Sequence, residues 1–397
     1  MIVSRQGRVL VRSVMVASLA AISLVSTAYS ADKIKIGFMS TLSGTLASAG
    51  TNLRDGFNLG LDHLGGKIGG LPTEIIIEDD QAKPDVARQI ADKFVEFNKV
   101  DVVTGILASN VMMAVHAPIT NAKVVLISPN AGPSPLAGDQ CSEYFFSTSW
   151  QGDNFSEAMG AYLQAKGAQN VYLMAPNYQA GKDVLAGFKR FFKGKLAGEV
   201  YTPLTQVDFS AELAQLRAAK PAAVFAFYPG GLGIQFVQQY VQAGLNSQIP
   251  LYTSYTIDNT TLPAIGDAAI GMTVTASWND DIDNEQNKKF VADYKKKYNY
   301  APSFYSAQAY DVTMLLDSAV RKVGGKIEDK AAFLAALKAA DFKSVRGNFK
   351  FNTNHFPIQD FYLGQVVKGG DGKPAIKLGE RVLKDHHDAY AANCPLK

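Results

Sequence analysis

Ser109 and Asn110 stand where a short apolar segment, DVVTGILA at residues 101–108, gives way to a helical pattern. At the start of a helix the first backbone N–H groups have no partner within the helix, and the positive end of the helix dipole lies there. A hydroxyl group beside them makes an anion site that suits a carboxylate. The same two residues would also suit a plain helix N-cap, and position alone does not separate the two roles.

A second run of small residues, SPNAG at 128–132, closes the next apolar segment, KVVLIS at 123–128. Asn130, Ala131 and Gly132 offer turn N–H groups at this second strand end. Ligands of open α/β sheets bind outside the carboxyl ends of the strands. The second run therefore favours the binding role for both segments.

Groups that would transform a substrate are scarce. The segment AGKD at 180–183 lacks the first glycine and the hydroxyl of a phosphate loop. The segment GGLGIQF at 230–236 lacks the third glycine of a dinucleotide fingerprint, and no acid ends the following strand. The sequence has no Gly-x-Ser-x-Gly elbow, and the pair Asp79 and Asp80 has no adjacent histidine. We expect no enzyme, no cofactor and no metal site, with a hydrolase as the weaker alternative.

The elements that must position these residues alternate between strands and helices in two series of similar length. The first expected series is strand 33–39, helix 48–64, strand 73–79, helix 83–97, strand 101–106, helix 110–122 and strand 123–128. The second is helix 153–166, strand 170–176, helix 181–193, strand 199–205, helix 210–219, strand 222–228, helix 232–243 and strand 249–255. Helices near 284–299, 303–322 and 328–340 precede closing hairpin-like β segments. The pattern predicts parallel sheets with right-handed crossovers in two α/β lobes.

The beginning of the chain is typical of an export signal. Three arginines, the last of them Arg12, form a basic start without any acid, and residues 14–25 are an apolar run too short to span a bilayer comfortably. The small residues of AYS at 28–30 predict cleavage before Ala31. We therefore expect residues 1–30 to be a signal peptide and the mature protein to be periplasmic, with an uncleaved anchor as the alternative.

The charge of the expected mature chain is balanced. Without the three arginines of the export signal, 36 basic residues face 36 acidic ones. Such a chain has no general reason to bind nucleic acid or an anionic membrane. Its roughly 367 residues are too many for one small core and indicate about two domains.

Cys141 and Cys394 are the only cysteines. In an oxidising compartment, two cysteines favour one disulfide. The alternatives are two free buried thiols or a metal site, and the scattered positions of the five histidines give a metal site little support.

Six segments follow one another in a specific order and spacing: KIKIGFMSTLSG, LRDGFNLGLDHLGG, IIIEDDQAKPDVA, VLISPNAGPSPLAG, YQAGKDVLAGFKRFF and APSFYSAQAYDVTMLL. In this order they make the chain resemble the type I periplasmic solute-binding proteins of ABC transporters, in the branched-chain-amino-acid-binding class. The resemblance implies an α/β fold of two Rossmann-like lobes, joined by a three-crossover hinge, with a ligand cleft between them. The implied partners are a small carboxylate ligand and an ABC permease in the inner membrane, and a monomer is expected.

The resemblance also implies where the lobes divide. We expect crossovers near 147–151, 277–281 and 352–358. The expected lobes are residues 31–148 plus 279–353 and residues 149–278 plus 354–397.

The resemblance assigns roles to individual positions. Ser109, with Asn110 beside it, matches the position that holds the ligand carboxylate, and the turn at 130–132 matches the next ligand-holding segment. Tyr228 matches an aromatic wall on the second lobe, and Tyr178 lies in a segment where the family supplies another aromatic side chain.

One departure from the family pattern concerns the ligand. Tyr255 stands where amino-acid-binding members carry the acid that meets the ligand ammonium, and an ammonium enclosed without a partner is costly. With Tyr178, Tyr228 and Trp150 it would form flat aromatic walls, which favour a benzoate-like aromatic acid. The alternatives are a receptor for a branched-chain amino acid or small amide and, outside the class, a sensor ectodomain or an enzyme.

Overall fold

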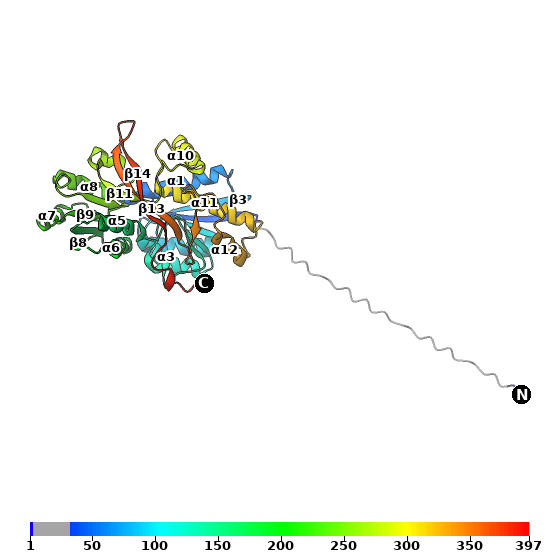
Figure 1. Ribbon diagram of the computed structural model, residues 1–397. Helices are drawn as coiled ribbons and strands as arrows, with labels where there is room; N and C mark the ends of the chain where they lie inside the picture. Colours follow the sequence, from blue (N-terminus) through cyan, green and yellow to red (C-terminus); the bar gives the residue numbers. More distant parts are fainter. Residues whose placement is uncertain (3–31, 397) are drawn as a thin grey trace.

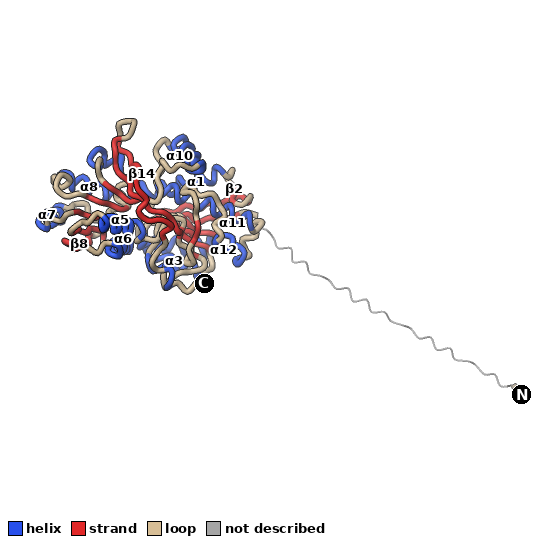
Figure 2. The backbone as a smooth tube through the Cα atoms, viewed as in Figure 1, coloured by secondary structure: helices blue, strands red, loops and turns tan. Residues whose placement is uncertain are grey.

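The computed structural model describes residues 1–2 and 32–396, which form two β-sheets with helices packed around them (Figure 1). Figure 2 shows the long strand β14 (Pro374–His386) crossing the middle of the view, with helices on both sides of it. The expected export signal and the cut before Ala31 lie outside the described residues, apart from the first two.

The first sheet has the strand order β2-β3-β1-β4-β5-β6. Its strands are β1 (Ile34–Ser40), β2 (Lys67–Ile68), β3 (Leu71–Asp79), β4 (Val102–Thr104), β5 (Val125–Ser128) and β6 (Phe145–Ser147). All neighbours pair in parallel except β2 and β3. β4 and β5 are buried along their whole length, which explains why both read as continuous apolar runs.

The helices of the first lobe come from both ends of the chain. They are α1 (Ala47–His63), α2 (Pro84–Asp92), the π-helix η2 (Lys93–Asn98), α3 (Ser109–Asn121), α4 (Ser134–Ala137), α10 (Glu285–Tyr298), α11 (Phe304–Lys322) and α12 (Lys330–Lys338). A side chain on Gly56 of α1 would lie 2.1 Å from the backbone oxygen of Ser306. This glycine therefore lets α11 pack closely on α1 and sets the position of the start of α11.

The second sheet has the order β12-β13-β11-β10-β9-β7-β8, with β14 paired to β13. Its strands are β7 (Asn170–Pro176), β8 (Lys195–Thr202), β9 (Ala223–Ala226), β10 (Leu251–Ser254), β11 (Thr273–Ala276), β12 (Lys350–Phe351), β13 (Pro357–Lys368) and β14. The main helices of this lobe are α5 (Asn154–Ala165), α6 (Gln179–Phe191), α7 (Ser210–Ala219), α8 (Gly231–Gln242) and α9 (Leu262–Ile265). The strands from β7 to β11 are parallel, and the β13–β14 hairpin closes the edge. Two parallel α/β lobes were predicted, and this fold class is confirmed.

The chain passes between the two sheets three times, at 148–153, at 277–284 and between α12 and β12. A fourth link is the disulfide from Cys141 to Cys394, with 5.7 Å between the Cα atoms. It confirms the predicted bond and ties the end of the chain to the loop between α4 and β6. The lobe boundaries stay a proposal, and the tail at 387–396, which was predicted to belong to the second lobe, is bonded to the first lobe at Cys394.

Candidate functional site

A cavity of about 50 Å³ lies between the two sheets. Almost every residue around it follows a strand, so the cavity sits at the carboxyl ends of both sheets, as expected for this architecture. Its volume is enough for about three to five water molecules, which limits an occupant of this conformation to a small molecule. The lining residues are Leu46, Ala49, Leu107, Ala108, Ser109, Asn130, Ala131, Gly132, Trp150, Gly152, Tyr178, Ala180, Val184, Phe227, Pro229, Tyr255 and Tyr305.

The first-lobe wall contains the start of α3. Ala108 is the N-cap of this helix and makes no side-chain cap bond, so the alternative reading of Ser109 as a plain N-cap is wrong. The first helical bond runs from the N–H of Met112 to the carbonyl of Ala108, which leaves the N–H groups of residues 109–111 free. Among the described residues, none receives a hydrogen bond from the Ser109 hydroxyl, and Ser109 is only 7% exposed. This end of the pocket can therefore donate several hydrogen bonds to an anion.

The turn at 128–132 forms the rest of that wall and is fixed by its own hydrogen bonds. The Asn130 amide donates to the carbonyl of Leu107 (2.6 Å), and the Ser128 hydroxyl donates to the carbonyl of Ala131 (2.7 Å). A side chain on Gly132 would lie 2.1 Å from the backbone oxygen of Trp150. Only glycine therefore allows the two lobes to approach at this point.

The second-lobe wall is built from aromatic rings. Tyr255 packs against Trp150, with ring centroids 5.0 Å apart, and against Phe155, at 4.4 Å. Tyr178 stacks on Phe227 at 6.2 Å, with 18° between the ring planes. Tyr255 has a φ of 58°, a conformation that bulky residues rarely adopt. Backbone strain of this kind gathers at ligand sites, where the surrounding structure holds it.

The sequence and fold of this chain also match proteins of known class. Residues 33–371 match the family model described as periplasmic binding protein. The chain belongs to the periplasmic binding protein family.

Solved structures agree in fold with this binding protein. The solute-binding protein of an ABC transporter from Rhodopseudomonas palustris, solved in complex with benzoate, is 30% identical over 92% of this chain and 100% of that one, with a TM-score of 0.86. A second from R. palustris BisB5, solved with 3,4-dihydroxybenzoic acid, is 29% identical over 90% and 99%, with a TM-score of 0.83. The Leu/Ile/Val-binding protein homolog 6 of Brucella melitensis is 28% identical over 91% of this chain and 94% of its own. The protein is thus a periplasmic substrate-binding protein of the ABC-transporter class.

The pocket of this binding protein has no charged side chain in its lining. Asp258, the first acid after Tyr255, is 3% exposed and borders a separate small cavity behind Tyr255 and Phe304. Burial raises the pKa of Asp258 to about 6. The ammonium partner that an amino acid would require is therefore missing from the pocket wall.

Two positions that were predicted to bind the ligand lie elsewhere. Asn110 is absent from the lining, and its amide donates to the carbonyl of Ala82 (3.3 Å), on the side of α2. Tyr228 is fully buried in the core of the second lobe, where its ring packs on Phe209 and its hydroxyl lies 3.3 Å from the Thr202 hydroxyl. Both corrections have the same geometric cause. Asn110 and Tyr228 each follow directly after a residue that lines the pocket, Ser109 and Phe227, and their own side chains point elsewhere.

Ten of the lining residues were not predicted, and two of these ten are aromatic. Phe227 supplies the wall that had been assigned to Tyr228, and strand alternation was the signal that could have found it. Tyr305 comes from the first turn of α11, and it lies in the segment APSFYSAQAY, which the resemblance had already singled out.

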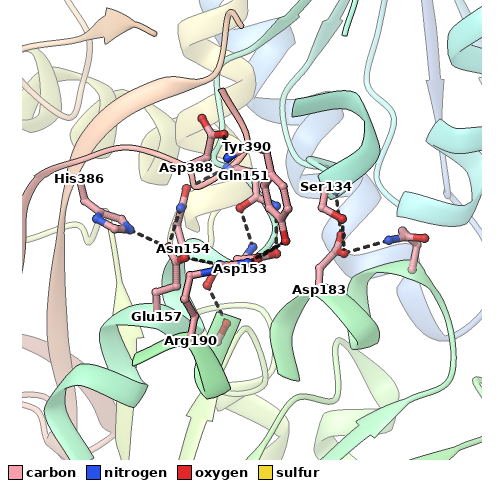
Figure 3. A network of polar contacts seen from close by, with 12 residues as sticks. Ser134, Gln151, Asp153, Asn154, Glu157, Asp183, Arg190, His386, Asp388 and Tyr390 are labelled. Carbon is pink, nitrogen blue, oxygen red and sulfur yellow. Dashed lines mark hydrogen bonds and ion pairs between the residues drawn. The ribbon is translucent and has the colours of Figure 1, made fainter. Parts of the chain in front are cut away.

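A polar network lies beside the pocket, where the two lobes meet (Figure 3). Ser134 of α4 donates its hydroxyl (2.7 Å) and its backbone N–H (3.0 Å) to the carboxylate of Asp183 in α6. Gln179 donates to the same carboxylate at 2.8 Å. The bonds from Ser134 join the first lobe to the second beside the pocket.

The chain's tail joins the same network (Figure 3). The Tyr390 hydroxyl and Arg190 both reach the same carboxylate oxygen of Asp153, each at 2.7 Å. Burial, and then the neighbouring Asp183, raise the pKa of Asp153 to about 7, which outweighs the opposing effect of Arg190. The tail between β14 and Cys394 is thus held by the second lobe through Tyr390 and by the first through the disulfide.

Arg346 fixes the crossover that carries Trp150. It is 5% exposed in its side chain and pairs with Asp311 of α11 at 3.0 Å. It also donates to the backbone carbonyls of Thr148 and Ser149 and to the side chain of Gln359. One buried guanidinium therefore connects α11, the first crossover and the start of β13.

A wider hollow of about 660 Å³ lies near the hinge, lined by residues that include Arg346, Lys350, Asp360, Arg381 and Asp385. Its acidic and basic side chains are largely paired with one another, as in Arg381 with Asp360 (2.8 Å). We assign the ligand site to the smaller pocket, because that pocket collects strand ends from both lobes.

No helix within residues 32–396 is long and apolar enough to cross a membrane.

Proposed function

We propose that this binding protein captures a benzoate-like aromatic acid in the cleft and presents it to an ABC permease. The observation that carries the proposal is the composition of the pocket lining: free N–H groups and a hydroxyl at the start of α3, aromatic rings opposite, and no charged side chain. The carboxylate would bind at Ser109 and the turn at 130–132. The flat ring would lie against Trp150, Phe227 and Tyr255.

The alternative is a branched-chain amino acid or a small amide, and the Leu/Ile/Val-binding name of the Brucella relative favours it. An α-amino acid would bring an ammonium into this cavity. Enclosing a charge without a partner costs several kcal/mol, by a rough estimate. The R. palustris neighbours solved with benzoate and 3,4-dihydroxybenzoic acid favour the aromatic acid.

Thermal unfolding in the presence of candidate ligands tests the choice. A ligand that binds the folded form at 100 times its Kd stabilises it by about 2.7 kcal/mol. We expect benzoate and hydroxybenzoates to raise the melting temperature, and leucine, isoleucine and valine to leave it unchanged. A shift with leucine and with none of the aromatic acids would overturn the proposal.

We also propose that residues 1–30 are removed on export, that the mature protein is a monomer, and that the lobes comprise 31–148 plus 279–353 and 149–278 plus 354–397. The intact mass of protein purified from the periplasm tests the cleavage before Ala31. Light scattering at micromolar concentration tests the monomer.

A further inference from the structure

Residues 387–394, which we call the strap, connect the two lobes beside the pocket. The strap follows β14 of the second sheet and ends with the 3-10 helix η4 (Ala391–Asn393) and Cys394. Just before it, the His386 ring lies 2.6 Å from a carboxylate oxygen of Glu157 in α5, on the second lobe. At its other end, the disulfide holds Cys394 to the first lobe. The two ends of the strap are thus fixed to different lobes.

Between its ends the strap lies against the first lobe. The Tyr390 ring packs on the apolar cluster of that lobe, which contains Phe145 of β6 and side chains of α2 and α3. A side chain on Gly138, at the end of α4, would lie 3.7 Å from the Cβ atom of Tyr390 and 3.8 Å from that of Asn393. The body of Tyr390 is therefore seated on the first lobe.

The hydroxyl of the same tyrosine reaches the second lobe (Figure 3). It donates to the carboxylate of Asp153 at 2.7 Å and accepts a hydrogen bond from the guanidinium of Arg190 at 2.8 Å. The central carbon of that guanidinium lies 5.2 Å from the centre of the tyrosine ring. Asp153 is fully buried at the start of α5. Both hydrogen bonds involve an ionisable partner, and bonds to charged groups are the stronger ones.

Separation of the lobes has to disturb the strap. The disulfide is covalent, so Cys394 must move with the first lobe, whereas Asp153 and Arg190 move with the second. Only η4 lies between Tyr390 and Cys394. Opening the cleft must therefore either break the two bonds of the Tyr390 hydroxyl or unwind η4 and pull the tyrosine ring from the first lobe.

From these observations we infer that the strap restrains the opening of the cleft, and that the Tyr390 hydroxyl is the group through which it does so. The restraint requires the disulfide, because without it Tyr390 would be bonded to the second lobe as part of a free tail. Any ligand in the pocket must wait for the lobes to separate, so the strap would slow its release. The inference concerns the motion of the lobes and is independent of which ligand the pocket binds.

One backbone amide beside the pocket reports this motion without any ligand. The Ser134 N–H donates to Asp183 on the other lobe at 3.0 Å. Its neighbours are Pro133 and Pro135, which have no N–H of their own. The Ser134 amide can exchange with deuterated water once its bond to Asp183 breaks. Its exchange rate, followed by NMR, therefore measures how often the lobes separate.

The variant Tyr390→Phe keeps the ring and removes the hydroxyl. In the disulfide-bonded protein, we expect the Ser134 amide of this variant to exchange about fivefold faster than that of the wild type. In the double variant C141S/C394S, the same substitution should change the rate by less than about 1.5-fold, because the strap no longer ties the lobes together. Equal acceleration with and without the disulfide would overturn the inference, as would an unchanged rate in the disulfide-bonded protein.

Tyr240→Phe is the matched control. Its hydroxyl donates to the carbonyl of Ile249 at 2.8 Å, within the second lobe. This variant should lower the free energy of unfolding and leave exchange at Ser134 unchanged, and chemical denaturation measures the stability of every variant. If the cysteine-free protein fails to fold, the two disulfide-bonded variants decide the matter. Faster exchange in Tyr390→Phe than in Tyr240→Phe supports the restraint, and equal exchange in both overturns it.

Discussion

The two walls of the pocket are built in different ways. The first-lobe wall consists of backbone N–H groups and small side chains around Ser109 and Gly132, whereas the second-lobe wall consists of the rings of Trp150, Phe227 and Tyr255. Backbone groups at a helix start and a turn suit any carboxylate. Rings define the shape and thickness of what lies against them. Under the proposed function, the first lobe would hold the carboxylate that many ligands share, and the second lobe would select among those ligands by shape.

This comparison assumes that the two lobes are held together. Reduction of the disulfide is the change that we expect to weaken their connection most. Reducing Cys141–Cys394 should lower the free energy of unfolding by roughly 4–5 kcal/mol, in the chain-entropy model of a very long closed loop. Affinity should change far less, because no residue of the tail lines the pocket. Chemical denaturation with and without reductant measures the first effect, and calorimetry measures the second. The double variant C141S/C394S controls for effects of the reductant. Equal stability of the oxidised and reduced forms would contradict this prediction.

Buried histidines and buried acids should respond to acid in opposite directions. Burial lowers the pKa of His116 in α3 and of His355, whose ring bonds to the carbonyl of Phe145 in β6, to about 4. Their neutral forms stabilise the fold above pH 6.5, and that stability, roughly 3 kcal/mol each, is lost as the pH falls towards 4. Burial raises the pKa of Asp258 to about 6 and, with Asp183 as the next cause, that of Asp153 to about 7. Their protonated forms favour the fold at low pH, and this contribution is lost as the pH rises from about 4 to the folded pKa values of about 6 and 7.

Hydrogen exchange followed by mass spectrometry between pH 4 and 7 resolves the lobes separately. Peptides of α3 and β6 should lose protection on acidification before those of the second sheet do. The variant His116→Leu removes one of the two histidine titrations and should reduce the loss by about half. Simultaneous loss in both lobes, unaffected by this variant, would contradict the comparison.

Within the first-lobe wall, Ser109→Ala should weaken binding of an aromatic acid by about 1–3 kcal/mol, because a buried carboxylate would lose a donor. The unfolding free energy without ligand should change less. Asn110→Ala is the neighbouring control, since its side chain bonds to Ala82 outside the pocket. Calorimetry should show nearly unchanged affinity for that control. Equal affinity of the Ser109 variant and the wild type would remove this hydroxyl from the site.

The smallest expected effect concerns the second-lobe wall. Phe227→Leu keeps an apolar side chain but loses the ring that stacks on Tyr178, so affinity for an aromatic acid should fall by about 0.5–1.5 kcal/mol. Tyr228→Phe should instead lower stability by a similar amount and leave affinity unchanged, because only the bond to Thr202 is lost. Competition binding at fixed temperature measures the affinity of both variants, and thermal unfolding measures their stability. A loss of affinity in Tyr228→Phe but not in Phe227→Leu would show that Tyr228, and not Phe227, contacts the ligand.

The sequence predicted the fold class, because alternation of strands and helices is a local signal, and it predicted the disulfide, because only two cysteines are present. Of the predicted small-residue wall, Ser109 and residues 130–132 line the pocket. The two wrong assignments in the predicted site, Asn110 and Tyr228, also have local causes. Side chains rotate by about 100° per residue in a helix, so Asn110 faces away from Ser109. In a strand they alternate, so an error of one residue exchanged Phe227 for Tyr228. Tyr305 could not be placed by any local rule, because tertiary packing of α11 on α1 through Gly56 brings it to the pocket.

The fourth link between the lobes also changes what a protease can do to the molecule. The disulfide closes a covalent ring across a sequence separation of 253 residues, and this ring contains the entire second sheet. A single cut anywhere between Cys141 and Cys394 opens the ring but leaves one covalently connected molecule. Two fragments would separate only on a reducing gel. The bond also cannot form until residue 394 has been made and delivered to the oxidising compartment, so an oxidised molecule records that both lobes have arrived there.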